Sequence, residues 1–241
     1  MDTPYTAAFY EMLQHGSAES ARHVLPEVSK VFNVSSVIDV GCGNGTWLRE
    51  FNRLGIESYL GLDGDYIDQK QLLIPADRFR ATDLQLPFDF GKFDLACSLE
   101  VGEHLPESAA DDFVASLTKA ASIVLFSAAI PYQGGNHHIN EQWQSWWATK
   151  FAARGYLALD FIRPIVRYNQ KIEAWYRQNI LVYCTPEARP KHIAPVLELR
   201  HLDLVLPEYY EVVLERETTR LPGGRRALRG LQHVVRQRLG L

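Results

Sequence analysis

The chain is poor in cysteine, and it lacks long apolar runs, an excess of positive charge and internal repeats. Among its 241 residues are three cysteines, Cys42, Cys97 and Cys184, with no C-x-x-C pair. An odd number of separated cysteines at apolar positions excludes a dense disulfide framework and indicates reduced thiols in a cytosolic protein. Cys42 fills a small-residue position between glycines, and we expect no nucleophilic role for it.

No apolar run approaches the ~18 residues of a membrane-spanning helix. The segment Met1-Asp2-Thr3-Pro4 has no basic stretch followed by an apolar core, so we expect no signal peptide. The formal net charge of −4 argues against the broad basic surface of proteins that bind RNA or DNA. These absences predict a cytoplasmic protein with no membrane span and no nucleic-acid partner.

What the sequence does contain is an alternation of short apolar runs with stretches of helical spacing. Strands are expected at 36–40, 58–62, 93–98, 122–127, 155–162 and 179–184, with one more short strand before Asp83, and helices at 46–54, 107–120 and 141–154. This alternation predicts an α/β fold with a mostly parallel sheet and helices on both faces. We expect the last two strands to form an antiparallel closing pair, joined by a polar and aromatic insertion.

The N-terminal part precedes this alternation. Residues 5–32 have helical spacing, and Ser17 and Ser20 around Gly16 predict two capped helices that lie across the ligand edge of the sheet. We expect these helices to cover a bound cofactor and exclude water. Their candidate covering residues are Tyr5, Phe9, Tyr10, His15 and Ser17.

The C-terminal part differs in character. Residues 197–206 predict a strand, 209–214 predict a short helix or strand, and from Arg216 onward arginine is frequent, as in a solvated helix or frayed end. We therefore divide the chain into an N-terminal helical cap at 1–32, a core at 33–185 and a C-terminal extension at 186–241.

The most informative segment is Val-Ile-Asp-Val-Gly-Cys-Gly-Asn-Gly at 37–45. A short buried strand is followed by three glycines that turn the chain into a helix, which brings bare backbone close to a ligand at the carboxyl edge of the sheet. A dinucleotide fingerprint needs its third glycine at position 46, where this chain has Thr46.

This G-x-G-x-G turn, with Asp39 inside the preceding strand, resembles motif I of the class I S-adenosylmethionine (SAM) dependent methyltransferases. The segment Phe93–Glu100 resembles motif IV of the same family, which lies beside the methyl donor. The resemblance covers about residues 33–185. It implies a Rossmann-like, seven-stranded, mostly parallel sheet, with SAM as cofactor and S-adenosylhomocysteine as product.

Three acids extend the resemblance to individual parts of the cofactor. Asp39 is expected to accept a hydrogen bond from the amino group, Asp63 has the spacing of a ribose acceptor, about 20 residues past the turn, and Asp83 faces the adenine amino group. Two of them have a structural alternative, since Asp63 can belong to a turn and Asp83 to a helix cap. The candidate cofactor-binding residues are Asp39, Gly41, Cys42, Gly43, Asn44, Gly45, Asp63, Asp83, Leu84, Leu99 and Glu100.

Two polar segments, 99–106 and 131–147, follow strands and open onto the same edge. Methyl transfer is an in-line displacement, and an oxygen nucleophile also needs a base. The candidate bases are His104 and His138, with His137 behind them, and the candidate acceptor-binding residues are Glu103, Asn140, Glu141 and Trp143. His104 also fits a capping or core histidine, and Trp143, Trp146 and Trp147 fit simple helix packing.

These segments, together with 175–183, resemble bacterial methyltransferases of surface-polysaccharide or secondary-metabolite pathways. The resemblance implies transfer to an oxygen of a sugar or small molecule, with a histidine as base. The alternatives are an N-methyltransferase, a metal-assisted O-methyltransferase, or a SAM-binding regulator without activity. A metal would use His137, His138, Glu103 and Glu141, but the segments lack an aspartate cluster, so we expect none. Thr46 and Asp39 disfavour a nicotinamide oxidoreductase.

Overall fold

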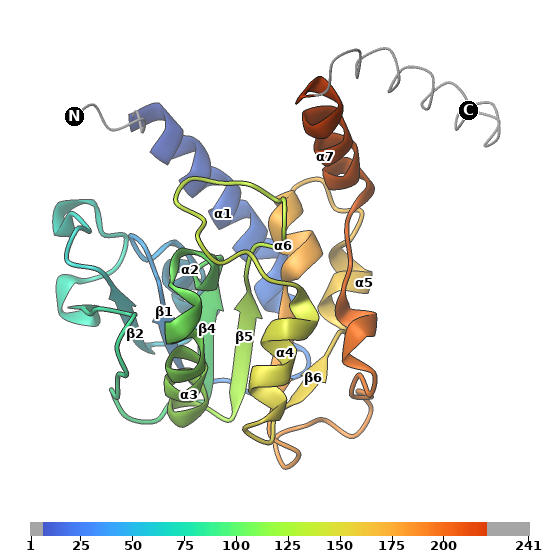
Figure 1. Cartoon of the computed structure of the whole chain (residues 1–241). Helices are drawn as coiled ribbons and strands as arrows, with labels where there is room; N and C mark the ends of the chain where they lie inside the picture. The colour runs from blue at the N-terminus through green and yellow to red at the C-terminus, as the bar shows by residue number, and fades with distance from the viewer. Residues whose placement is uncertain (1–6, 221–241) are drawn as a thin grey trace. The chain divides into compact units, whose positions relative to one another are not determined.

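A seven-stranded sheet forms the centre of the computed structural model, which describes residues 7–220 (Figure 1). The strand order is β3-β2-β1-β4-β5-β7-β6. Their bounds are β1 (Ser36–Val40), β2 (Ser58–Asp63), β3 (Phe79–Ala81), β4 (Leu95–Leu99), β5 (Ile123–Ser127), β6 (Leu157–Leu159) and β7 (Leu181–Cys184). Only β7 runs antiparallel to its neighbours, β5 and β6, which confirms the predicted closing pair.

The central strands β4 and β5 are buried along their whole length. Such near-continuous apolar runs are typical of parallel strands whose two faces are both covered. Successive side chains alternate between two core clusters, so Leu95 and Cys97 enter one and Ala96 enters the other. The sheet therefore needs helices on both faces.

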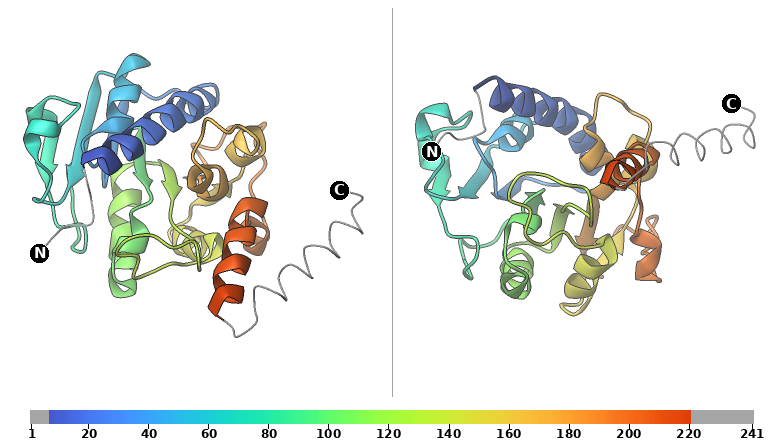
Figure 2. Two further views of the ribbon diagram at one scale, coloured as in Figure 1. Left: turned by 90° about the horizontal axis from the view of Figure 1, so that it is seen from above. Right: turned by 45° about the horizontal axis from the view of Figure 1, so that its top comes forward.

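Helices cover both faces, as Figure 2 shows from above. The first core cluster combines α1 (Ala7–Ser29), α2 (Thr46–Arg53), α5 (Ile162–Val166) and α6 (Ala174–Asn179) with the sheet. The second combines α3 (Ala110–Ala120) and α4 (Gln144–Ala152) with the opposite face. Short 3-10 turns stand at Gln69–Gln71, Ala76–Arg78, Gly102–His104, Glu107–Ala109 and Leu199–Leu202.

The prediction of two N-terminal helices is wrong, because α1 continues through Gly16 without a break. The hydroxyl of Ser20 donates to the Gly16 carbonyl at 2.7 Å, four residues back, so this serine bonds within the helix instead of capping it. From Ala18 to Val28, buried side chains pack beside α2 on one face of the sheet. Tyr5 and the side chains of Phe9, Tyr10 and His15 lie outside the described residues.

The predicted strand at 197–206 is also wrong, since this segment forms the turn Leu199–Leu202, with Leu202 buried in the second cluster. Of the two alternatives for 209–214, the helix is confirmed by α7 (Pro207–Arg220). The chain separates into two compact units, Met1–Leu204 and Val205–Leu241, and every candidate site residue belongs to the first. The arginine-rich tail from 221 on lies outside the described residues, and the three-part division stays a prediction.

Smaller differences concern element ends. The helix predicted from 107 begins as a 3-10 turn, the helix predicted from 141 begins at Gln144, and Asn179 ends α6 instead of starting β7. Glu141 and Trp143 therefore lie in a loop before α4. Within residues 7–220, no helix has both the length and the apolar character needed to cross a membrane.

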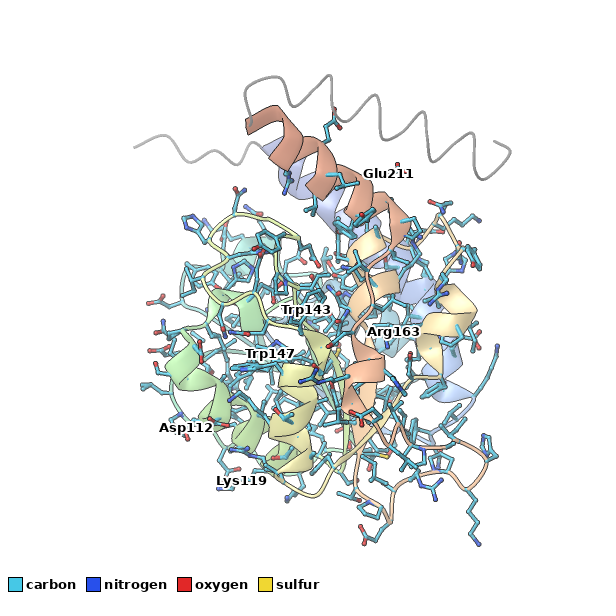
Figure 3. The ribbon with its side chains drawn as sticks, turned by 45° about the vertical axis from the view of Figure 1, so that its right-hand side comes forward. Asp112, Lys119, Trp143, Trp147, Arg163 and Glu211 are labelled. Atoms are coloured by element: carbon cyan, nitrogen blue, oxygen red, sulfur yellow. The ribbon has the colours of Figure 1, made fainter. Side chains whose placement is uncertain are left out.

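Arg163 connects the segments around the last two strands of the sheet, β6 and β7 (Figure 3). Its side chain is 1% exposed, and it forms two hydrogen bonds to the Asp160 carboxylate, at 2.8 and 2.6 Å. It also donates to the carbonyls of Gln178 and Leu202, at 3.1 and 2.8 Å. A buried cation with one anion and two carbonyls fixes α5, α6 and the turn Leu199–Leu202 in one arrangement.

Candidate functional site

A pocket of about 940 Å³ opens beyond the carboxyl ends of β1, β2 and β4. The strand order reverses between β1 and β4, which is where open α/β sheets bind ligands. One wall includes Gly41, Gly43, Asp63, Asp83 and Leu84, and we call it the donor half after its predicted role. The other wall includes Glu100, His104 and His137, and together with the rest of the loop 131–142 we call it the acceptor half.

The glycine turn forms the floor of the donor half. Gly41 has φ of 83°, and a Cβ on it would lie 2.2 Å from the Val101 side chain, so only glycine fits there. Gly43 has φ of 55°, and a Cβ on it would meet nothing within 4 Å. Gly43 therefore leaves bare backbone facing open space at the pocket.

The Asp63 carboxylate, at the end of β2, holds the glycine turn. One oxygen accepts from the Gly43 amide at 2.7 Å, and the other accepts from the Gly64 amide at 2.7 Å and the Tyr66 hydroxyl at 2.6 Å. The Tyr66 residue is 79% exposed, so its hydroxyl occupies a position that a ligand hydroxyl can take over. Tyr66 was not among the predicted site residues.

Asp39 and Cys42 support the turn from behind and do not line the pocket. Burial, with a smaller contribution from the negative charge of Asp63, raises the pKa of Asp39 to about 8. Burial likewise raises the pKa of the Cys42 thiol, which agrees with the prediction that it is not a nucleophile. Asn44 accepts from the Thr46 hydroxyl at 2.8 Å.

Asp83 and Leu84 close the donor half after β3. The Asp83 carboxylate accepts a hydrogen bond from the Gln85 amide at 3.0 Å, which forms a local turn. Both Asp83 and Leu84 line the pocket. Gly45 and Leu99, both predicted to bind the cofactor, do not line it, and Leu99 belongs to the first core cluster.

Glu100 begins the acceptor half, directly after β4, with φ of 56°. Its carboxylate accepts from Gln133 at 3.0 Å and from Asn179 at 3.2 Å, so α6 and the loop 131–142 meet at this side chain. Burial raises the pKa of Glu100. Gln133 and Asn179 were not among the predicted site residues, although Gln133 lies in the predicted polar segment 131–147 and Asn179 in the segment 175–183.

Glu103 lies deeper than Glu100 and is 0% exposed. Neither oxygen of its carboxyl has a hydrogen-bond partner among the described residues, although the Glu100 carboxyl and the Ala129 backbone lie close enough to influence it. Burial and the adjacent Glu100 charge raise the pKa of Glu103 well above its usual range. An isolated buried carboxyl of this kind is rare in a stable core.

His104 and His138 lie side by side, with ring centroids 4.9 Å apart and planes at 86°. Nδ1 of His104 is 3.3 Å from the His137 carbonyl oxygen, which can only accept, so Nδ1 carries the hydrogen. Partial burial, followed by the neighbouring His138, lowers the pKa of His104. His137 lines the pocket, whereas His138 does not line it and packs against the His104 ring.

The Glu141 carboxylate fixes His138. One oxygen lies 2.9 Å from Nδ1 of His138 and accepts from the Gly134 amide at 2.8 Å, while the other accepts from the Tyr132 amide at 2.8 Å. A Cβ on Gly135 would lie 2.2 Å from Nε2 of His138, so the ring needs a glycine beneath it.

The loop 131–142, which arches over the upper ends of β4 and β5 in Figure 1, is pinned to Glu103. The amides of Ile139 and Asn140 both donate to the Glu103 carbonyl, at 2.9 and 3.0 Å. Trp143 is 41% exposed at the end of this loop, whereas Trp147 is 1% exposed and packs in the second cluster (Figure 3). Among the predicted acceptor residues, Trp143 alone offers an exposed ring.

With this geometry in view, the comparisons with known proteins place the chain in a family. Residues 13–161 match the family model described as "Methyltransferase domain". The chain belongs to this methyltransferase family. It is a class I SAM-dependent methyltransferase by family and has the Rossmann-like fold of that class.

Two plant proteins resemble a part of this methyltransferase. The chain is 35% identical over 99 residues to a tocopherol O-methyltransferase of Arabidopsis thaliana, and 36% identical over 97 residues to a probable tocopherol O-methyltransferase of Oryza sativa subsp. japonica. These stretches cover 37% and 36% of the chain, and only 28% and 26% of the curated relatives.

Solved structures show the same fold. DesVI of Streptomyces venezuelae aligns with a TM-score of 0.55 at 17% identity, covering 76% of this chain and 100% of its own. Magnesium protoporphyrin IX methyltransferase of Synechocystis PCC 6803, with bound S-adenosylhomocysteine, aligns with a TM-score of 0.51 at 16% identity, covering 77% and 90%. At such identities the likeness concerns the fold alone.

Proposed function

We propose that this methyltransferase transfers a methyl group from SAM to an oxygen of a small molecule or glycan. The observation that carries the proposal is a single pocket with two chemically different walls: a glycine turn with two carboxylates faces a pair of histidines. Support for an oxygen acceptor comes from the plant relatives, whose names describe O-methyltransferases. The pathways implied by the resemblance, polysaccharide or secondary-metabolite synthesis, belong to the same proposal.

The donor half fits SAM in size and in chemistry. Bare backbone at Gly41 and Gly43 leaves room for the methionine part, and Asp63 offers a carboxylate oxygen that now holds the Tyr66 hydroxyl, as it would hold a ribose hydroxyl. Asp83 would accept from the adenine amino group, and Leu84 would pack on the ring. When bound, the cofactor supplies an electrophilic methyl group on its sulfonium.

The acceptor half would orient the hydroxyl and take up its proton. His104 lines the pocket, and its Nδ1 is held by the His137 carbonyl, so Nε2 remains for the acceptor. His138 and Glu141 stand behind His104 and fix its surroundings. Trp143 offers a ring on which a sugar or aromatic acceptor can stack.

Calorimetric titration of the protein with S-adenosylhomocysteine and with NAD tests the donor side. We expect binding of the first and none of the second; preference for NAD would overturn the proposal. Labelled SAM incubated with a panel of sugars, phenols and amines then tests the acceptor side. Transfer to amines alone would make the enzyme an N-methyltransferase, and binding without transfer to any class would indicate a regulator.

His104→Ala separates catalysis from cofactor binding. We expect a fall in turnover of roughly 100-fold, in the range usual for general bases, with unchanged affinity for S-adenosylhomocysteine. The matched control is His192→Asn, at an exposed position away from the pocket, which should change neither quantity.

A further inference from the structure

Three metal-ligating side chains converge behind the acceptor wall of the pocket. One carboxylate oxygen of Glu103 and one ring nitrogen each of His104 and His138 lie within 4.8 Å of one another. The three residues come from the turn after β4 and from the loop 131–142, so the fold brings them together from separate segments. Two imidazoles and one carboxylate form a ligand set that first-row transition ions prefer over Mg²⁺.

The carboxyl of Glu103 is an independent sign that a partner is missing. It is fully buried, and both oxygens lack a hydrogen-bond partner among the described residues. A buried carboxyl without a partner is costly, and both burial and the neighbouring Glu100 charge disfavour its charged form. A cation between Glu103 and the two histidines would supply the compensating charge.

Each of the two histidines also has the hydrogen-bond arrangement that is typical of a metal-ligating histidine. In such sites the second ring nitrogen donates to a carbonyl or carboxylate, which fixes the ring and leaves the first nitrogen free for the metal. Nδ1 of His104 lies 3.3 Å from the His137 carbonyl, and Nδ1 of His138 lies 2.9 Å from the Glu141 carboxylate. Nε2 of each ring is then the nitrogen with a free lone pair.

The loop around His138 holds the imidazole ring in a position that suits metal binding. Two backbone amides fix the Glu141 carboxylate, and Gly135 leaves the space at Nε2 of His138 clear of a side chain. The amides of Ile139 and Asn140 bind the Glu103 carbonyl, which keeps Glu103 and His138 in register. A ligand–metal distance of about 2.1 Å requires the three atoms to close by roughly 1 Å, within reach of a side-chain rotation.

We propose that Glu103, His104 and His138 bind one divalent transition-metal ion, which holds the oxygen of the methyl acceptor at the pocket wall. This inference rests on the proposed function and names the chemistry of its acceptor side, but it makes His104 a metal ligand in place of the general base. Bound to a divalent ion, a hydroxyl loses its proton to water at a lower pH. Its oxygen lone pair then forms the new O–CH₃ bond while the S–CH₃ bond breaks, and the electron pair of that bond stays on sulfur as S-adenosylhomocysteine leaves.

Cobalt binding tests the site without any need for turnover. The full chain is freed of metal with EDTA and titrated with Co²⁺, whose visible absorption reports nitrogen and oxygen ligands, and with Mn²⁺ and Zn²⁺ by calorimetry. We expect one ion per chain. Glu103→Gln and His138→Asn should weaken binding about 10- to 100-fold or more, while His192→Asn should not. Affinity for S-adenosylhomocysteine should stay unchanged in all three variants, which also confirms that they fold.

The failure of the metal site and the failure of the proposed function would give different experimental results. If the wild-type protein binds none of the three ions, or if Glu103→Gln and His138→Asn bind them as tightly as wild type, the metal site is wrong. Full methylation of a hydroxyl in EDTA would also overturn it while leaving the proposed O-methyltransferase intact. An ion bound at these three residues in a protein that methylates no hydroxyl would instead overturn the proposed function.

Discussion

The two walls of the pocket treat their carboxylates in opposite ways. In the donor half, Asp63 already accepts three hydrogen bonds, one of them from the Gly43 amide of the glycine turn. In the acceptor half, Glu103 is fully buried and accepts none that the described residues provide. A satisfied carboxylate gives a preformed wall, whereas an unsatisfied one marks a place where a ligand completes the structure.

Backbone conformation separates the two halves in the same way. The donor half places its positive φ angles at glycines, Gly41, Gly43 and Gly45, where they cost little. The acceptor half has one such glycine, Gly134, and in addition Glu100, Tyr132 and His137, the three non-glycine residues with positive φ in the described chain. Strain of about 1–3 kcal/mol at such residues persists only where surrounding contacts enforce it. The acceptor half therefore depends on tertiary packing.

Replacement of Arg163 should have the largest effect and tests that dependence. Arg163→Met leaves Asp160 without its counter-charge and the carbonyls of Gln178 and Leu202 without their donor. We expect the free energy of unfolding to fall by about 3–5 kcal/mol, measured by urea denaturation. The control is Lys119→Met, because Lys119 forms an ion pair with Asp89 in which both side chains are exposed, and such pairs contribute about 0–1 kcal/mol. Equal losses in both variants would contradict the role of Arg163.

Asp63→Asn tests whether the donor half acts on the cofactor independently of the acceptor half. An amide retains one acceptor for the backbone but cannot take both ribose hydroxyls. We expect the Kd for S-adenosylhomocysteine to rise by about 100-fold, from roughly 3 kcal/mol of lost charge-assisted hydrogen bonding. Asp77→Asn, exposed and outside the pocket, is the control. If the Asp63→Asn variant still binds S-adenosylhomocysteine tightly, the assignment of Asp63 to the ribose hydroxyls is wrong.

Gly135→Ala should displace the His138 ring in the acceptor half and leave the donor half unchanged. The added Cβ would overlap the His138 ring, with 2.2 Å to Nε2, so the ring must shift. A displacement near 1 Å should lower kcat by roughly 10- to 100-fold, with little change in affinity for S-adenosylhomocysteine. In the double variant with His138→Ala, the glycine change should add nothing further. Additive losses would show that Gly135 acts through another residue.

Asp39→Asn should change how stability depends on pH. The folded protein holds the pKa of Asp39 at about 8, above its ordinary value of 3.8, so the folded state binds more protons between these limits. Its contribution to the free energy of unfolding therefore falls as pH rises from about 4 to about 8, by at most about 1.4 kcal/mol per unit.

Thermal melts of wild type and Asp39→Asn at several pH values measure this difference. The stability of the variant relative to wild type should increase through the window and become constant above it. A difference that does not change with pH would mean that Asp39 is ionised in the folded protein.

Much of the fold could be predicted because its signals are local. Apolar runs located every strand of the sheet, and the glycines at 41, 43 and 45 located the turn beneath the pocket. The errors fell where packing overrides local preference. Gly16 sits within a continuous helix because its missing side chain leaves room for Glu173, and residues 199–202 form a turn that buries Leu202.

By itself, the sequence determined the class of the sheet, the place of the glycine turn and the pair Asp63 and Asp83, since spacing along one or two adjacent elements specifies all of them. Only the tertiary structure decided that Glu103 has no partner, that His104 and His138 adjoin, and that Glu141 fixes His138 instead of facing the acceptor. The physical reason is that the turn Gly102–His104 and the loop 131–142 follow different strands, and no periodicity along the chain can align them.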